Sequence, residues 1–363
     1  MKIFERLNLY LMNRFFMGFV SAYATLGVIV LLFNTVELMR RAAGRDYMSF
    51  QTVFGLSLLG LPQIMESLMP FVFLFGAMMV FWRLNRSNEL VIIRTGGVSV
   101  WQFLKPAFLV ALFWGVLQVA LFNPFSAAMT ERYNVLSAKY FEQSIYQSFI
   151  STDGLWLRQN DDTGTVILHA GIVNPDFSLR DITAFFYDEN YDFAKRVDAD
   201  AATLIDGQWI FDRAVITDGD GKRKRQPEWR LNSNLTVDKI QESFSPPESL
   251  SIWRLPDFIT VLEKSGFSAL SHRLYFHELL ATPFTLMSMI LLAACFSITP
   301  QRQKRTLFLI SGGILSGFIY YTFSDIVHAL GGSGRIPILL SAWAPFFVAV
   351  FFGSSFLLHQ EDG

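Results

Sequence analysis

The chain has 363 residues, of which 52% are hydrophobic and 17% charged, with a formal net charge of −1. This balance does not indicate a nucleic-acid partner, and the single cysteine, Cys295, excludes a disulfide framework and a cysteine-rich metal site. Charge is concentrated in residues 151–265, with long apolar stretches on either side. The composition therefore predicts an integral membrane protein with one polar domain.

Residues 2–13 place their apolar side chains on one helical face, which predicts an amphipathic helix in the membrane interface. Residues 15–36 follow as the first span, because about 20 apolar residues cross the roughly 30 Å of a hydrocarbon core. This run is too long for the core of a signal peptide, and Glu37, not a small-residue cleavage site, follows it. We therefore expect an uncleaved membrane helix.

Two further spans are expected before the polar domain. The second lies within residues 53–82, where Pro62 and Pro70 predict a kinked helix. The third covers residues 103–122 and is broken near Pro124, after which a polar helix continues outward.

Residues 148–250 have a different pattern. Short runs of alternating apolar and polar residues are separated by turn sequences such as Asp218-Gly-Asp-Gly221, which is typical of an all-β sandwich or jelly roll. Pro256 then begins a short connecting helix. The spans of a second apolar bundle lie near residues 274–298, 306–330 and 337–358.

The predicted fold is a polytopic α-helical membrane protein with six transmembrane helices in two three-helix halves and an inserted β-jellyroll-like domain. Residues 1–147 hold the interfacial helix and the first three spans, residues 148–250 form the β domain, and residues 251–363 hold the connecting helix and the last three spans. An even number of spans places both termini on one side. Basic residues near the N-terminus and in the connections on that side mark it as cytoplasmic, so the β domain is expected outside.

One basic cluster contradicts the positive-inside rule. Arg40, Arg41 and Arg45 fall in the first loop on the outer side. A basic cluster placed against the topological preference indicates a task, such as holding an anion.

Four ionisable residues fall inside predicted spans, where a charge costs a few kcal/mol near the bilayer centre: Glu66, Glu278, Asp325 and His328. Asp325 and His328 are three residues apart and can pair on one helical face. These residues either have a structural or interfacial role or line the path of a polar-headed substrate.

Residues 83–99 form the only substantial loop expected in the cytoplasm. Ser87 can cap a short helix there, and the following Gly-Gly pair can end it. The helix has an apolar side and two charges, Glu89 and Arg94. It is either a docking helix for a cytoplasmic partner or an interfacial helix that merely connects two spans. No zinc-protease pattern, phosphate loop or nucleophile–base set can be argued, so an enzymatic activity has little support and no metal or cofactor is expected.

The order of parts is distinctive: three helices, an outer β domain and three more helices, with a Glu-bearing cytoplasmic helix after the second span. Together with Arg-Ser-Asn-Glu-Leu-Val-Ile-Ile-Arg-Thr-Gly-Gly-Val-Ser at residues 86–99, this order resembles the LptF/LptG permease family over essentially the whole chain. Members form the membrane part of the lipopolysaccharide exporter. The segments that resemble the LptG branch more than the LptF branch are residues 250–255, 262–266, 272–283 and 334–337.

The resemblance implies a transmembrane permease subunit of an ATP-driven exporter, which extracts lipopolysaccharide from the bacterial inner membrane toward a periplasmic bridge. It implies three protein partners: an LptF-type permease subunit, a cytoplasmic LptB-type ATPase dimer and an LptC-type membrane-anchored periplasmic protein. ATP hydrolysis is expected in the ATPase and not in this chain. The β domain is expected in the periplasm and both termini in the cytoplasm.

The resemblance also implies site residues on the cytoplasmic side. Glu89 matches the carboxylate of the family's coupling helix, which engages the ATPase. Leu90 and Arg94 belong to the same coupling segment, at about residues 86–97.

On the outer side, Arg40 and Arg41 match a basic pair that faces lipopolysaccharide phosphates, and Arg132 lies near further basic positions of the family. Asn34 departs from a nearby position that is often basic, so the head-group chemistry of the substrate can differ here. Removing one fourteen-carbon acyl chain from a bilayer costs about 10 kcal/mol, at roughly 0.8 kcal/mol per CH₂. An apolar cavity must therefore receive the chains, and an engine must drive their release.

The main alternative is a non-transporting membrane scaffold or receptor whose outer β domain binds a ligand or a protein. Copurification of a stable ATPase separates the exporter from this scaffold. A stand-alone secondary transporter would need an ion-coupled pair near the middle of the membrane, and the predicted depth of Asp325 and His328 argues against it. A membrane enzyme has the least support, because no convergent acid–base set is present.

Overall fold

The computed structural model describes residues 2–43, 48–141, 155–161, 164–174, 178–188, 192–205, 207–233, 246–264, 268–297 and 306–362. Arg45 and the basic connection at 299–305 lie outside the described residues. The chain divides into two compact units. The helical unit comprises Met1–Tyr133, Glu248–Leu255 and Leu270–Gly363, and the β unit comprises Asn134–Pro247 and Pro256–Ala269.

The chain begins with α1 (Lys2–Ala42), a continuous helix of 41 residues. The amphipathic segment and the first span, which the sequence predicts as separate elements, are joined in it without a break. No proline lies between residues 2 and 42, so nothing in the backbone forces the helix to end at the polar–apolar boundary.

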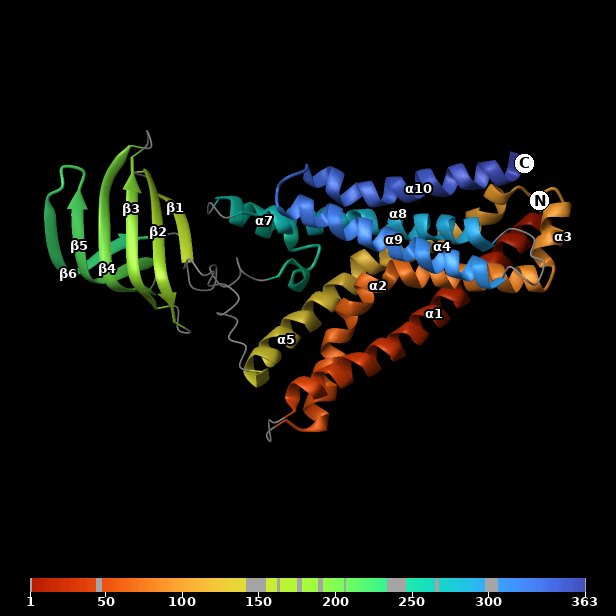
Figure 1. Cartoon of the computed structure of the whole chain (residues 1–363), viewed down its shortest axis with the longest axis horizontal. Helices are drawn as coiled ribbons and strands as arrows, with labels where there is room; N and C mark the ends of the chain where they lie inside the picture. Colours follow the sequence, from red (N-terminus) through yellow and green to blue (C-terminus); the bar gives the residue numbers. More distant parts are fainter. Residues whose placement is uncertain are drawn as a thin grey trace. The chain divides into compact units, whose positions relative to one another are not determined.

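The second helix, α2 (Phe50–Arg86), begins at Ser49, whose side chain accepts a hydrogen bond from the Thr52 backbone N–H. Pro62 and Pro70 both lie inside it. Figure 1 shows that α2 changes direction along its length, as the two prolines predict.

The third span differs from its prediction at the proline. α4 (Val100–Leu117) continues through a π-helical turn, η1 (Gln118–Phe122), into α5 (Asn123–Phe141). Pro124 does not break the helix, because it sits in the first turn of α5 after the register has shifted in η1. The Ala120 carbonyl, which has no N–H donor four residues on, accepts a hydrogen bond from the Trp253 indole Nε1 at 3.2 Å.

The remaining helices are α3 (Glu89–Thr95), α7 (Leu255–Lys264), α8 (Leu270–Ser297), α9 (Thr306–Gly332) and α10 (Ile338–Asp362). Among the described residues, five helical segments are long and apolar enough to cross a membrane: Glu5–Ala42, Phe50–Arg86, Val100–Phe141, Leu270–Ser297 and Ile338–His359. The remaining predicted span, residues 306–330, coincides with α9, whose 27 residues extend about 40 Å at 1.5 Å per residue. The polytopic helical architecture is confirmed.

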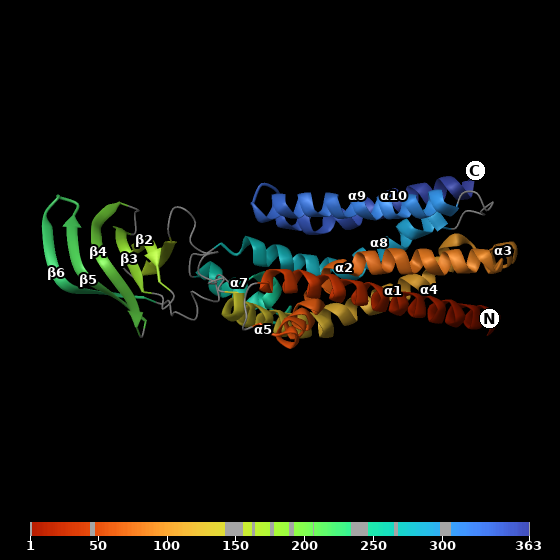
Figure 2. The same ribbon diagram turned by 60° about the horizontal axis from the view of Figure 1, so that its bottom comes forward.

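Aromatic side chains form the centre of the helical unit. Phe15 and Phe19 of α1 pack against Phe81 and Phe73 of α2, with ring centroids 5.3 and 4.1 Å apart, and all four side chains are fully buried. Figure 2 shows α9 and α10 running side by side next to α8. Interlocked rings of this kind fix the relative positions of the helices that carry the sites described below.

The inserted β domain is confirmed as a six-stranded antiparallel sheet in the order β1-β2-β3-β4-β5-β6. Its strands are β1 (Leu155–Asp161), β2 (Gly164–Val173), β3 (Leu179–Tyr187), β4 (Phe193–Ile205), β5 (Gln208–Asp218) and β6 (Arg223–Asn232). Within the described residues this order is a meander, whereas a jelly roll crosses between two sheets. Alternating residues can predict strands, but they do not specify how the strands are connected.

The two faces of the sheet differ in burial. Trp209 and Phe211 of β5 are fully buried and pack with Trp229 of β6 in one apolar cluster.

The predicted turn after Asp218 is confirmed, and Gly221 has the positive φ of 79° that a glycine adopts without strain.

Candidate functional site

The loop between α2 and α4 contains the predicted short helix, α3. Asn88, and not the predicted Ser87, is its N-cap residue, because α2 runs to Arg86 and Ser87 ends it. Gly96 and Gly97 end α3 as predicted, and Gly97 has a φ of 83°. The connection between the two helices is therefore only two residues long.

The two sides of α3 are in different environments. Leu90 is 2% exposed and belongs to the apolar core of the helical unit. Val91 and Ile92 are 44% and 67% exposed, and Arg94 is exposed in the last turn. Leu90 thus anchors the helix, and its neighbours present an apolar and basic surface.

The Glu89 carboxylate at the start of α3 is held by two side-chain hydroxyls. The Tyr10 hydroxyl donates to Oε2 at 2.7 Å, and the Ser87 hydroxyl donates to Oε1 at 2.9 Å. Arg14 Nε donates in turn to the Tyr10 hydroxyl at 2.9 Å, with its guanidinium 5.0 Å from the Tyr10 ring centre. The sequence gives no signal for the Tyr10 contact, because Tyr10 and Glu89 are 79 residues apart.

The predicted basic pair lies in the last turn of α1, where both arginines bind Glu37. Arg40 Nε lies 2.9 Å from Glu37 Oε2, and Arg41 Nε lies 2.9 Å from Glu37 Oε1. The Arg40 and Arg41 side chains are nonetheless 76% and 54% exposed. Arg132, in α5, is also exposed, and no hydrogen bond or ion pair joins it to either arginine in the part of the chain that the structure describes.

A cavity of 630 Å³ in the helical unit lies near these residues. Its walls include Asn34 of α1, Gly60 of α2 and Tyr133 of α5. Arg41 is seven residues from Asn34, which puts it on the same helical face about 10 Å further along. Arg132 directly precedes Tyr133. Neither Arg41 nor Arg132 is among the described residues that line this cavity.

Asn34 makes a contact between two helices. Its Nδ2 atom donates to the Ser57 backbone carbonyl at 3.3 Å, which connects α1 to α2.

A second cavity, of 330 Å³, is almost entirely apolar. Its walls include Tyr23 of α1, Met69 of α2, Trp114 of α4 and Phe125 of α5. Apolar and aromatic walls of this kind suit a hydrocarbon chain and offer little to a polar head group.

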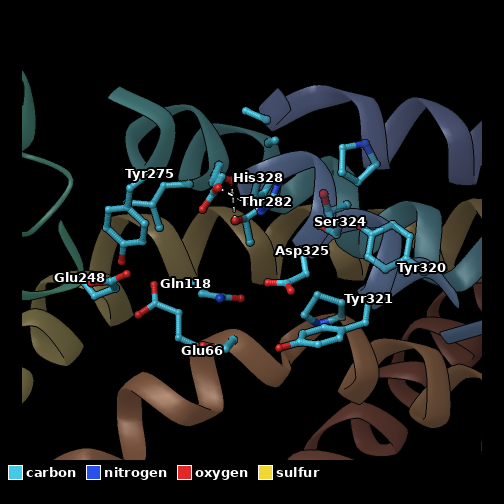
Figure 3. A pocket seen from close by; sticks show the side chains of 18 of the residues that line it. Glu66, Gln118, Glu248, Tyr275, Thr282, Tyr320, Tyr321, Ser324, Asp325 and His328 are labelled. Carbon is cyan, nitrogen blue, oxygen red and sulfur yellow. Dashed lines mark hydrogen bonds and ion pairs between the residues drawn. The ribbon is translucent and has the colours of Figure 1, made fainter. Parts of the chain in front are cut away.

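The four ionisable residues predicted inside spans come together in one pocket. Glu66, Glu278, Asp325 and His328 all line a cavity of 280 Å³ between α2, α8 and α9 (Figure 3). His328 Nδ1 lies 3.0 Å from Glu278 Oε1, so its ion-pair partner is Glu278, while Asp325, which the spacing allows as a partner, interacts with His328 only electrostatically. The partner comes from the neighbouring helix because α8 and α9 pack against each other.

Asn123 connects this pocket to the chain segment before α7. It is fully buried, and its Nδ2 atom donates to Glu66 Oε1 and to the Tyr275 hydroxyl, both at 3.0 Å. Its Oδ1 atom accepts the Ile252 backbone N–H at 2.8 Å. The sequence indicates Asn123 only as part of an Asn-Pro break, so this role was not predictable from spacing.

Comparison with known proteins gives consistent results. A family model described as "Lipopolysaccharide export system permease LptF/LptG" matches residues 9–359. The lipopolysaccharide export system permease protein LptG of Escherichia coli (strain K12) is 24% identical over 299 residues, which cover 80% of this chain and 80% of the relative. The protein of the same name from Haemophilus influenzae (strain ATCC 51907 / DSM 11121 / KW20 / Rd) is 24% identical over 344 residues, covering 90% of this chain and 91% of the relative.

Proposed function

Because the chain belongs to the lipopolysaccharide export system permease family LptF/LptG, we propose that it is the LptG-type subunit of an ATP-driven lipopolysaccharide exporter. The chain extracts lipopolysaccharide from the bacterial inner membrane toward a periplasmic bridge and hydrolyses nothing itself. The LptG name of both relatives supports the choice of branch. Both termini lie in the cytoplasm and the β unit in the periplasm.

The proposal includes three protein partners: an LptF-type permease subunit, an LptB-type ATPase dimer and an LptC-type membrane-anchored periplasmic protein. The energetics of extraction require such an assembly. Each acyl chain costs about 10 kcal/mol to remove from the bilayer. Burial in the cavities of 630 and 330 Å³ offsets part of that cost, and release of the lipid then needs an external source of free energy.

The observation that carries the proposal is the geometry of α3. It is a helix of seven residues between two membrane-spanning helices, anchored by Leu90 and exposed at Ile92. An acidic residue at its start and Arg94 at its end flank this apolar surface. A groove on a cytoplasmic ATPase can grip such a helix and push it, and the core contact of Leu90 transmits the force to the spans.

Substrate binding is assigned to Arg40, Arg41 and Arg132. Arginine binds phosphate oxygens through pairs of parallel hydrogen bonds. Glu37 occupies part of the hydrogen-bonding capacity of Arg40 and Arg41. A lipid phosphate would replace Glu37 as their partner or share them with it, which makes this end of α1 a reversible anion site.

Purification in mild detergent tests this function. We expect mass spectrometry of the purified chain to find an ATPase, a second permease subunit and bound lipopolysaccharide. A chain that purifies alone from cells producing all of its partners, with its β unit bound to some other ligand, would instead support the scaffold alternative.

A further inference from the structure

The pocket between α2, α8 and α9 is rich in carboxylates. Glu66, Glu248, Glu278 and Asp325 line its 280 Å³, and no lysine or arginine is among the described residues that line it. Glu66 accepts a hydrogen bond from Asn123, and Glu278 is paired with His328. Glu248 and Asp325 have no hydrogen bond or ion pair to any described residue. Two carboxylates therefore line the cavity without an ion pair to a described residue, and His328, which interacts electrostatically with Asp325, is paired with Glu278.

A second feature of the same pocket points to a ligand. Gln118 lines it and is 3% exposed, yet its Oε1 atom has no hydrogen-bond partner in the described part of the chain. Buried amide oxygens almost always have a partner, because leaving one unpaired costs free energy. Figure 3 shows the Gln118 amide and the Asp325 carboxylate pointing into the same space. Both groups accept hydrogen bonds, so the missing partner is a donor.

The backbone at Gln118 also departs from a regular α-helix. Gln118 begins the π-helical turn η1, and such turns are frequent at functional sites because they re-aim a side chain within a helix. In a regular α-helix, the residues after Gln118 would be rotated differently about the axis. The buried Gln118 thus lies at the point where the helix changes register.

The remaining walls indicate the chemical nature of the donor. Tyr275, Tyr320 and Tyr321 contribute rings, and Pro70 and Leu279 contribute apolar surface. Aromatic faces attract organic cations. By contrast, no cluster of three or more His, Cys, Asp or Glu side chains among the described residues is compact enough to hold a metal ion. The cavity is also far larger than a bare ion, since one water takes about 30 Å³.

We propose that this pocket binds an organic molecule with a primary ammonium group. The ammonium donates to Gln118 Oε1 and to the Asp325 carboxylate, Glu248 on the Tyr275 side of the pocket adds a second negative charge, and the tyrosine rings pack against the carbon atoms of the ligand. The site does not suit the phosphates of an anionic lipid, which its carboxylates repel. It is thus distinct from the basic end of α1, and it stands whether or not the proposed export function is correct.

Binding of radiolabelled ethanolamine to the full chain in nanodiscs tests this proposal. In nanodiscs of phosphatidylglycerol, which has no amine, we expect saturable binding that is at least tenfold weaker in Asp325→Asn, Glu248→Gln and Gln118→Leu. Asp257→Asn, which removes an exposed carboxylate from α7, is the matched control and should bind like the wild type. Asp325→Asn breaks no hydrogen bond to a described residue, so its effect does not depend on a folding defect.

A second set of nanodiscs identifies the source of the amine. If a lipid supplies it, phosphatidylethanolamine nanodiscs should block ethanolamine binding, and native mass spectrometry should find retained phosphatidylethanolamine on the wild type but not on Asp325→Asn. If the source is a soluble amine, ethanolamine should bind equally in both kinds of nanodisc. Absence of ethanolamine binding in phosphatidylglycerol nanodiscs, equal affinity in the three pocket variants, or binding of K⁺ or Mg²⁺ in place of ethanolamine would each overturn the proposal.

Discussion

Single residues at the two ends of α1 carry much of the proposed function. Near its start, Tyr10 holds the Glu89 carboxylate, and in its last turn Arg40 and Arg41 share Glu37. Because α1 is continuous between them, a displacement of Glu89 by a cytoplasmic partner can reach the basic end through one helix.

Reversal of the charge at Glu89 tests the coupling role. Glu89→Lys should abolish lipopolysaccharide export and association with the ATPase while leaving membrane insertion intact, because the side chain lies at the surface. Tyr10→Phe should have a milder effect of a few-fold to about tenfold, since one hydrogen bond contributes about 0.5–1.5 kcal/mol. Export assays and copurification of the ATPase measure both. Unchanged transport together with unchanged ATPase binding in Glu89→Lys would remove Glu89 from the coupling site.

From the ion pairs of Glu37 we expect two variants to change crosslinking to lipopolysaccharide in opposite directions. Replacing Arg40 and Arg41 with glutamine should weaken photo-crosslinking to lipopolysaccharide, because the cationic partners of its phosphates are lost. Glu37→Gln should strengthen crosslinking, because it removes the carboxylate that competes for both arginines. Equal crosslinking in the wild type and both variants would show that this end of α1 does not bind the substrate.

At the scale of single elements, α3 carries a buried residue, Leu90, and an exposed residue, Ile92, whose roles can be tested separately. Ile92→Asp should eliminate copurification of the ATPase without lowering the thermal stability of the chain, since Ile92 is 67% exposed. Leu90→Ala should lower the stability, because truncating a buried leucine typically costs about 2–5 kcal/mol. An Ile92→Asp chain that still retains its ATPase would contradict docking through this face.

The helix from α4 through η1 to α5 depends on a side chain far along the sequence. Trp253→Phe removes the indole donor to the Ala120 carbonyl, which has no N–H donor four residues on because residue 124 is proline. We expect a loss of about 1 kcal/mol, visible as a lower unfolding temperature. Trp101→Phe in α4 is the control, since Trp101 is 37% exposed and donates no hydrogen bond to a described residue. Equal unfolding temperatures for both variants would show that the Trp253 contact contributes nothing.

At the scale of the whole molecule, hydropathy and turn chemistry predict most of the architecture. The apolar runs predict the long helices, and alternation and Asp218-Gly-Asp-Gly221 predict the β domain, because both signals are local. Connectivity within the sheet is not local, so the meander was not predictable.

The candidate sites show the same difference between local features, which the sequence predicts, and contacts between distant residues, which it does not. Glu89 and the arginines are predicted from the placement of charge and from family resemblance, and the ionisable residues in the predicted spans stand out as unusual residues in apolar runs. The partners of these residues were missed: Tyr10 for Glu89 and Glu278 for His328. Both contacts join residues of different helices. They depend on how the helices pack, which a single sequence does not specify.

The most direct measurement of the central claim is ATP-dependent release of lipopolysaccharide from proteoliposomes. The vesicles would contain this chain with the permease subunit and the ATPase that copurify with it, and a periplasmic acceptor protein would be supplied outside. We predict transfer of lipopolysaccharide to the acceptor with ATP, no transfer without ATP, and none with the Glu89→Lys chain. Transfer that is independent of ATP, or unaffected by Glu89→Lys, would contradict an export function driven through α3.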